Sequence, residues 1–365
     1  MGLQLLWYDD DLSSPEYQGD LTPYIEDLGF TTKLHGGFDF LIAGLNRPLV
    51  PAWRWLQEHY HHRLILLDRM HQTHFEGRVE DVRMTDKGVE IVVAGYWASC
   101  FDQVYNRANA GLEDISVLIK AALTDSCPAI SSDQSNIADN TMEVPQYLDD
   151  DRYPGDLITG WCEQSDSEGD ATYFFAVWEN RIPHYSKIQA SEADWVVHRS
   201  ALAPQGLRLQ ASAANIYTRV KTKYSNIVNT TSAELETAWA SDYTGPLGSA
   251  IRDHVLSLSG STSTAAQKAR DAFLAAHVNL KYNLAITVEK KMTDAQGALW
   301  PNWYVRAGDV IDILDLIPHE LLFDLSESGL DRIYIKATHW RNGSLEIVPD
   351  MEPEMAALVL ANVGS

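Results

Sequence analysis

The sequence predicts a mainly β protein with a few helices, organised as two β-rich modules that form barrels or sandwiches rather than a βαβ sheet. Segments in which apolar and polar residues alternate occur near both ends of the chain. Each end also carries a hairpin signal, Asp86-Lys87-Gly88 in the first part and Asn342-Gly343 in the last. Because 365 residues exceed what one hydrophobic core usually supports, we expect about two to three domains.

The N-terminal part is expected to be mainly strands. Residues 3–8 and 63–67 are rich in β-branched and large apolar side chains, and residues 75–84 and 89–94 flank the turn at Gly88 as a hairpin. Between them, Pro51 opens a segment with few helix breakers, so a short helix over residues 51–61 is predicted.

The middle of the chain mixes helix, loop and strand. Apolar residues at helical spacing predict a helix over residues 112–123, which Pro128 and the polar residues 131–141 end. Aromatic and β-branched residues then predict a buried strand over residues 172–178. Strict alternation over residues 216–224 predicts a strand with one basic face, and an alanine-rich stripe predicts a helix over residues 265–278.

The C-terminal part returns to strands. Residues 280–288 alternate, and residues 333–340 and 344–348 flank Asn342-Gly343 as a second hairpin. These elements divide the chain into an N-terminal β-barrel module (1–110), a helix with an acidic linker (111–153), an inserted β/helical or α/β domain (154–279) and a C-terminal β-barrel module (280–365).

Negative charge dominates the chain and is concentrated in one stretch. Asp and Glu number 51 against 28 Lys and Arg, and residues 121–180 hold thirteen acids against one base, Arg152. Such a surface repels nucleic acid phosphate and anionic membranes. Such a surface has two possible roles: it keeps the protein soluble, or it lines a passage through which polyanions move without binding.

Two charged groups are candidates for an interface or a channel lumen. Arg219, Lys221 and Lys223 form the basic face of the strand at 216–224, and Asp149, Asp150 and Asp151 form an acidic run. The three bases either pair with acids in the same chain or meet the acidic segment of an adjacent copy, where complementary charge would fix the register.

No enzymatic or cofactor-binding motif stands out. The chain lacks G-x-S-x-G, S-x-x-K, a Walker loop and G-x-G-x-x-G, and its aspartate runs do not follow the EF-hand pattern. His59, His61, His62, His71 and His74 cluster without a zinc-binding spacing, although His59 and His62 would share one helical face. We therefore expect no enzyme activity, no cofactor and no resident metal.

The sequence also gives an expectation for the compartment. Cys100, Cys127 and Cys162 are odd in number and widely spaced, which argues against a disulfide framework and for folding in a reducing cytoplasm. The N-terminus lacks the pattern of a secretory signal, and no apolar run is long enough to span a bilayer.

Four segments, taken in order, resemble one protein family. They are residues 75–79 (FEGRV) leading through 88–91 (GVEI) to 94–96 (AGY), residues 177–181 (VWENR), the stretch from Asn215-Ile216 to 241–243 (SDY) with its following helix, and residues 305–311 (VRAGDVI) before the Asn342-Gly343 hairpin. Together they resemble the baseplate or tail-tip hub proteins of long-tailed bacteriophages.

The resemblance implies two tube-type β-barrel modules, interrupted by inserted domains, in a non-enzymatic structural protein of the virion tail. It further implies a homo-oligomeric ring, commonly a trimer whose two modules mimic a six-fold tail tube. Neighbouring tail proteins (tail tube, distal tail, tape measure, and tip or fibre proteins) would be its partners, and DNA would pass through without specific binding. The protein would be made in the bacterial host cytoplasm.

Two alternatives stay open at this point. Within the same class, the chain could be the hexameric distal tail adaptor, which one tube-like module per chain would favour. From another class, it could be a carbohydrate-binding or glycan-hydrolysing β protein with tryptophan platforms. That alternative requires exposed, coplanar rings among six tryptophans, namely Trp53, Trp55, Trp161, Trp195, Trp300 and Trp303.

Overall fold

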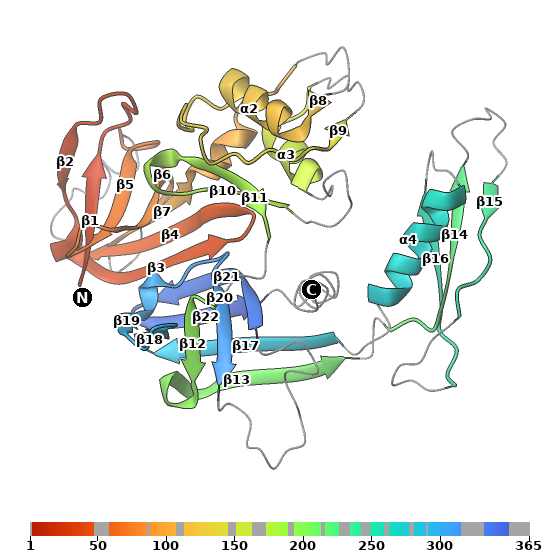
Figure 1. Cartoon of the computed structure of the whole chain (residues 1–365). Coiled ribbons are helices and arrows are strands. Elements are labelled where there is room, and N and C mark those ends of the chain that lie inside the picture. The colour runs from red at the N-terminus through yellow and green to blue at the C-terminus, as the bar shows by residue number, and fades with distance from the viewer. Residues whose placement is uncertain are drawn as a thin grey trace. The chain divides into compact units, whose positions relative to one another are not determined.

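The computed structural model confirms the mainly β prediction (Figure 1). It describes residues 2–46, 58–84, 86, 88–106, 113–144, 151–162, 173–188, 193–212, 216–225, 234–241, 249–258, 263–276, 281–289, 291–314 and 332–349. Two compact units are present, one formed by residues 1–207 and 286–350 and the other by residues 208–285 and 351–365. The predicted division into four segments stays a prediction, and most of the predicted helix at 51–61 lies outside the described residues.

The N-terminal strands form one antiparallel sheet. The strands are β1 (Leu3–Tyr8), β2 (Tyr17–Asp20), β3 (Ile25–Lys33), β4 (Gly36–Asn46), β5 (Arg63–Asp68), β6 (Thr73–Met84) and β7 (Gly88–Gly95). They pair in the order β2–β1–β5–β6–β7–β4–β3. The predicted strands at 3–8 and 63–67 and the predicted hairpin at 75–94 are therefore confirmed.

A small helical insert follows this sheet. It contains a 3-10 turn (Tyr96–Phe101), α2 (Ile115–Ser126), α3 (Pro154–Cys162), and the short strands β8 (Glu113–Asp114) and β9 (Glu143–Val144). The Asp114 side chain caps α2 by accepting from the Ser116 N–H at 2.7 Å. The apolar face of α2 is buried with α3 in one cluster, which explains the helical spacing seen in the sequence.

Two strands connect the insert to the N-terminal sheet. The strands β10 (Tyr173–Val177) and β11 (Pro183–Lys187) form an antiparallel pair, and β10 runs parallel to the start of β4. At this parallel contact, a Cβ on Gly37 would lie 2.3 Å from the Val177 carbonyl oxygen, so only glycine fits there.

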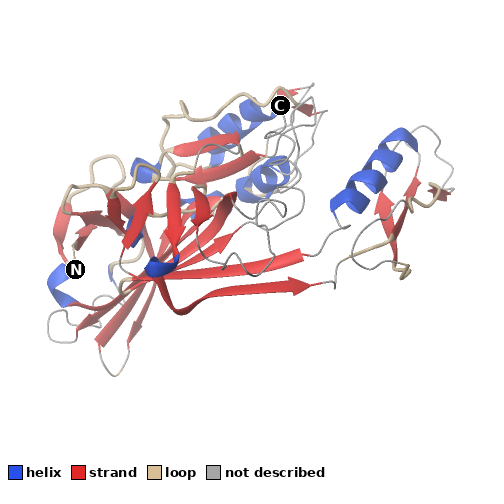
Figure 2. Ribbon diagram, turned by 60° about the horizontal axis from the view of Figure 1, so that its bottom comes forward, coloured by secondary structure: helices blue, strands red, loops and turns tan. Residues whose placement is uncertain are grey.

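The C-terminal strands form a second group. They are β12 (Trp195–His198), β13 (Leu202–Ser212), β17 (Lys281–Glu289), β18 (Lys291–Asp294), β19 (Leu299–Pro301), β20 (Val310–Leu314), β21 (Arg332–Arg341) and β22 (Ser344–Pro349). One series of pairs runs β17–β22–β21 and another runs β21–β20–β12–β18–β19. The long strand β13 lies beside β17 (Figures 1 and 2).

The hairpin between β21 and β22 has the predicted turn. Asn342 and Gly343 both have positive φ, 49° and 96°, as a two-residue turn between twisted strands requires. The strand predictions at 280–288, 333–340 and 344–348 are confirmed.

The two groups of strands join edge to edge. Residues 29–33 of β3 pair antiparallel with residues 337–341 of β21. On the buried side of this junction, the hydroxyls of Thr32 and Thr338 lie 2.7 Å apart, and the Phe30 ring stacks on the Trp340 ring at 5.3 Å between centroids. Barrel modules were predicted, but within the described strands no pairing closes either group, so both are open parts of one continuous sheet.

A buried asparagine holds the C-terminal group together. Asn302 lies in the 3-10 turn η5 (Asn302–Tyr304), and its side-chain amide donates to the carbonyls of Val288 at 3.1 Å and Gly343 at 2.8 Å. Its side-chain oxygen accepts from the indole N–H of Trp340 at 3.0 Å. One side chain thus links η5 to β17, to the β21–β22 turn and to the junction with β3.

The second unit has its own small sheet and helix. Its sheet contains β14 (Arg219–Ser225), β15 (Glu234–Glu236) and β16 (Asp253–Leu258). The strand β14 lies in the middle, where it pairs antiparallel with β15 and parallel with β16. The helix α4 (Ser263–Ala276) packs on β14 and β16 (Figure 1), with the ring of Phe273 stacked on His254 at 4.5 Å. None of the helices in the described part of the chain is long and apolar enough to cross a bilayer.

We predict that Asn302→Ala lowers the free energy of unfolding by about 2 to 4 kcal/mol, because it leaves the buried Trp340 N–H without an acceptor. Urea denaturation followed by fluorescence measures this change. Asn46→Ala, at an exposed position on β4, serves as the control, with an expected change within about 0.5 kcal/mol. Equal effects of the two substitutions would contradict the role given to Asn302.

We also predict that the native protein does not react with Ellman's reagent. All three thiols are buried in the helical insert, and burial raises the pKa of the Cys100 thiol, whose sulfur lies 3.5 Å from that of Cys127. Three thiols should react once the chain is unfolded in guanidinium. Rapid reaction of the native protein would show that this insert opens readily.

Candidate functional site

The joined sheet has one exposed face that crosses the junction between the two groups of strands. In antiparallel pairs, directly opposed residues point to the same side of the sheet. One row of opposed residues runs across seven strands, from β17 to β6: Glu289, Ser344, Arg341, Gly29, Ile42, Val92 and Asp81. The intervening residues of these strands, such as Leu28 and Leu41, are buried.

This exposed face carries more acids than bases. Together with the two adjacent rows, it presents the acids Asp27, Asp81, Glu90, Glu289 and Glu346 and the exposed bases Arg83 and Arg341, while Arg78 at the end of one row is buried and paired with acids. Arg83 pairs with Asp81 at 2.7 Å and with Glu90 at 3.3 Å. In the next row Lys33 pairs with Asp39 at 3.0 Å.

The second arginine of this face is also neutralised. Arg341 donates to Asp27 at 3.1 Å, and this hydrogen bond holds the pKa of Asp27 below its usual value. Since every base named on the face has an acidic partner, the surplus carboxylates give the face its negative sign.

Behind this sheet, a carboxylate links the N-terminal strands to η5. The carboxylate of Asp68, at the end of β5, accepts from the Tyr304 hydroxyl and from the backbone N–H groups of Met70 and Gln72 at 2.8 and 3.0 Å, and lies 3.3 Å from His74. Burial acts to raise the pKa of Asp68, but the hydrogen bonds outweigh it and keep that pKa low. Burial lowers the pKa of His74 despite the nearby Asp68, so the imidazole is neutral at neutral pH.

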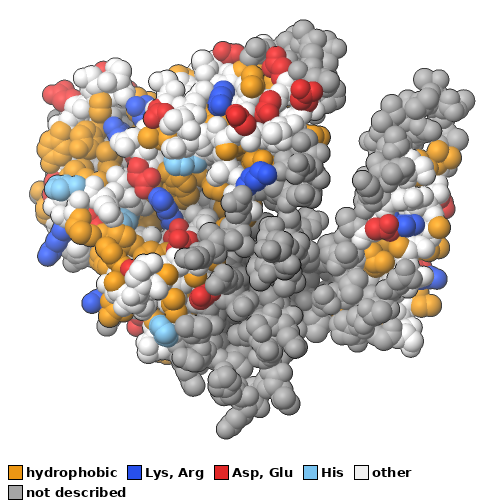
Figure 3. Space-filling model, in the orientation of Figure 1, with side chains coloured by type: hydrophobic (Ala, Val, Ile, Leu, Met, Phe, Trp, Pro, Cys, Tyr) orange, Lys and Arg blue, Asp and Glu red, His pale blue; other side chains and the backbone are white. Residues whose placement is uncertain are grey.

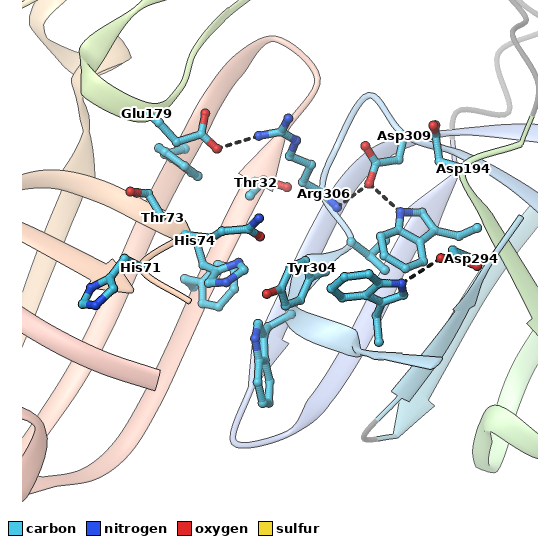
Figure 4. Close-up of a pocket in the computed structure, with 17 residues that line it drawn as sticks. Thr32, His71, Thr73, His74, Glu179, Asp194, Asp294, Tyr304, Arg306 and Asp309 are labelled. Atoms are coloured by element: carbon cyan, nitrogen blue, oxygen red, sulfur yellow. Dashed lines mark hydrogen bonds and ion pairs between the residues drawn. The ribbon is translucent and has the colours of Figure 1, made fainter. Parts of the chain in front are cut away.

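A cavity of about 720 Å³ opens beside this link, between the N-terminal and C-terminal strands (Figure 4). Thr32, Thr73 and His74 reach it from the N-terminal strands, whereas Tyr304, Arg306 and Asp309 reach it from the C-terminal side. Its aromatic wall comes from six rings, those of Phe30, Phe38, Trp195, Trp300, Trp303 and Tyr304.

Charged groups surround this aromatic wall. Glu179 and Arg306, which both line the cavity, form an ion pair at 2.8 Å, and Arg306 also lies over the Trp178 ring at 4.9 Å. Asp309 accepts from the indole N–H of Trp195 at 2.8 Å and from the Arg306 backbone N–H at 2.9 Å. Burial raises the pKa of Asp309 to about 6, although Arg306 and both hydrogen bonds act in the other direction.

Three of the six tryptophans singled out in the sequence meet in this cavity. They are Trp195, Trp300 and Trp303, whereas Trp161 is buried in the helical insert and Trp53 and Trp55 lie outside the described residues. Their convergence could not be read from the sequence, because Trp195 precedes Trp300 by more than a hundred residues.

The basic strand face has partners within its own unit. Arg219 pairs with Asp253 at 2.7 Å, and Lys221 and Lys223 pair with Glu236 at 2.9 and 3.6 Å. The acids lie on the strands that flank β14, which is the intramolecular arrangement weighed above. A contact of this face with another copy stays a prediction.

The acidic run is only partly described. Asp149 and Asp150 lie outside the described residues, whereas Asp151 is exposed and exchanges hydrogen bonds with the Asn106 side chain at 2.8 and 3.1 Å. Figure 3 shows red side chains gathered at the top, over the helical insert. Exposed acids of residues 121–180 in this insert are Asp125, Asp133, Asp139, Glu143 and Asp156.

The histidines of the sequence cluster lie in more than one setting. The rings of His59 and His62 lie 5.0 Å apart, and His62 Nδ1 accepts from the Trp7 indole N–H at 2.9 Å. His74 instead belongs to the Asp68 link. Among the described residues, no three His, Cys, Asp or Glu side chains are grouped as metal ligands.

Comparison with solved structures relates the whole chain to phage tail proteins. The 43 kDa tail protein of prophage MuSo2 from Shewanella oneidensis matches with a TM-score of 0.61 at 12% identity, covering 96% of this chain and 99% of that one. Prophage tail protein gp18 from Listeria monocytogenes matches at 0.58 and 11% identity, covering 99% and 98%. The tail protein from Neisseria meningitidis matches at 0.58 and 10% identity, covering 98% and 99%.

Sequence comparison adds nothing to this result, since no protein-family model and no curated protein matches the chain. The resemblance to phage tail proteins inferred from four sequence segments is nonetheless confirmed at the level of the fold.

We predict that Asp309 makes stability depend on pH. Because the pKa of Asp309 in the folded protein, about 6, lies above the usual aspartate value of about 3.9, the folded state binds the proton more tightly than the unfolded state. Its contribution to the free energy of unfolding is therefore greatest below about pH 4 and falls as pH rises to about 6. Urea titrations between pH 4 and 7 should show Asp309→Asn gaining stability relative to wild type across this window. A constant difference would contradict the raised pKa.

Proposed function

We propose that this protein is a non-enzymatic structural component of a phage tail that forms the ring-shaped hub at the distal end of the tail tube. The observation that carries the proposal is the end-to-end match with three tail proteins, which covers nearly the full length of both chains in each case. A match over one module alone would have pointed only to a shared domain.

The joined sheet supports a ring built from few copies. Each chain contributes two groups of strands to one continuous sheet through the β3–β21 pairing. Three copies would then supply six such groups around an axis, enough to match a six-fold tube. This favours the trimeric hub over the hexameric adaptor, which needs only one group per chain.

An open strand edge supports assembly through strands. On β6, residues 73–78 pair with β5, but residues 81–84 pair only with β7 among the described strands. Such an edge presents backbone N–H and C=O groups that another copy can complete.

The exposed sheet face is our candidate for the channel wall. It carries five acids, and both of its arginines are already paired with carboxylates. A wall of this kind repels the phosphate backbone and offers DNA no basic anchor, so the genome passes without being held.

The proposed site of action is the virion tail, after synthesis in the bacterial host cytoplasm. The partners would be other tail proteins, namely tail tube, distal tail, tape measure, and tip or fibre proteins. No catalytic role is assigned, because three of the four carboxylates that line the cavity hold backbone and indole N–H groups in place and the fourth, Glu179, is paired with Arg306.

We predict that the purified protein forms a trimer, with a mass about three times 40.9 kDa by light scattering at moderate salt. Negative-stain images of the same fractions should show rings with an axial hole. A hexameric mass would favour the distal adaptor. A monomer at every concentration tested would contradict the self-assembling ring.

We predict that Glu289→Lys combined with Glu346→Lys converts the channel wall into a DNA-binding surface. Anisotropy of labelled duplex DNA should then report binding that weakens on the order of 10³-fold between 50 and 200 mM salt, as expected for about six phosphate contacts per trimer.

The control for this variant is Asp10→Lys combined with Asp125→Lys. It makes the same change in charge at two exposed acids outside the sheet face. Wild type and control should not bind DNA. Equal binding by the two double variants would show that the sheet face does not line the channel.

A further inference from the structure

In the aromatic cavity shown in Figure 4, three rings already use their polar edges in hydrogen bonds to the protein. The indole N–H of Trp300 donates to Asp294 at 2.8 Å, that of Trp195 donates to Asp309 at 2.8 Å, and the Tyr304 hydroxyl donates to Asp68. These bonds fix the orientation of the rings from behind. A molecule that enters the cavity can therefore contact only the apolar surface of these rings.

The rings that remain accessible form a bent platform. Trp300 and Tyr304 are partly exposed, with their centroids 5.0 Å apart and their planes inclined by 50°. Trp303, also partly exposed, continues the wall, and its indole nitrogen is buried with no hydrogen-bond partner among the described residues. With its nitrogen enclosed by protein atoms, Trp303 contributes apolar ring surface to the wall.

Polar groups surround this platform. Thr73, Gln72 just before it and Glu179 line the cavity from the N-terminal side, whereas Arg306 and Asp194 line it from the C-terminal side. Asp194 uses one carboxylate oxygen to accept from the Val310 N–H at 2.8 Å. The cavity thus combines an apolar platform with hydrogen-bond donors and acceptors on more than one side.

The chemistry of this lining selects among ligand classes. Four carboxylates against one arginine disfavour phosphates and other anions. The polar groups around the platform disfavour a purely apolar ligand, which would leave them unpaired. A volume of about 720 Å³ lies within the range of small-molecule sites.

We infer that this cavity binds a neutral saccharide unit, with a sugar ring stacked on Trp300 and its hydroxyl groups bonded to the surrounding polar side chains. A pyranose offers what the lining requires, because it has an apolar C–H face and a rim of hydroxyls that donate and accept.

The test is a screen of purified protein against an array of bacterial surface oligosaccharides. Tryptophan fluorescence titrations with glucose, galactose, rhamnose and N-acetylglucosamine then quantify binding. We expect at least one saccharide to bind saturably. Trp300→Ala should weaken its affinity about tenfold or more, because the substitution removes the aromatic ring on which the sugar stacks. Trp300→Phe, which keeps a ring, should retain part of the affinity.

A matched control is Trp239→Ala, which removes an indole 38% exposed in the other unit and should leave saccharide binding unchanged. Melting temperature and mass show whether each variant stays folded and assembled. The inference fails if no saccharide binds saturably or if Trp300→Ala binds as well as wild type. It also fails if spermidine competes for the site more strongly than any saccharide, which would make the cavity a site for organic cations.

Discussion

The antiparallel pairing of β3 with β21 is the contact on which the rest of the larger unit depends. It joins strands more than three hundred residues apart in sequence, and the alternation of side chains across it creates two different surfaces. Phe30 and Thr32 point to the buried side, toward Trp340 and the cavity, whereas Gly29 and Thr31 belong to the exposed face. A slip of one residue in this register would exchange the two surfaces, so the cavity and the candidate channel wall are set by the same hydrogen bonds.

Buried polar groups specify how segments of the larger unit meet, where apolar packing alone would tolerate alternatives. The Thr32–Thr338 contact, the Asn302 amide and the Asp68 carboxylate each bridge segments that are distant in sequence. An unpartnered polar group in a core is costly, so each of these bonds penalises a shifted arrangement more than a methyl contact would. The same logic places Asp309 against Trp195 and orients the aromatic wall of the cavity.

Only the folded protein shows which charged side chains pair with one another and where the unpaired acids lie. Among the described residues, several bases are paired with acids nearby, as Arg219, Lys221 and Arg341 illustrate. The acids in surplus are left on the helical insert and on the exposed sheet face. Both features suit the proposed tail function, because paired bases offer no phosphate anchor and surplus acids repel a polyanion.

The sequence by itself determined the mainly β class, the strand at residues 3–8, both hairpins and the helices near residues 115 and 265, because these depend on local periodicity, turn chemistry and capping. Order along the chain also sufficed for the likeness to phage tail proteins. Only the tertiary structure decided that the strands form open parts of one sheet instead of two barrels, that the basic strand face pairs within its own unit, and that Trp195, Trp300 and Trp303 meet in one cavity. Those outcomes depend on which strand edges pair across hundreds of residues, and no local pattern encodes that choice.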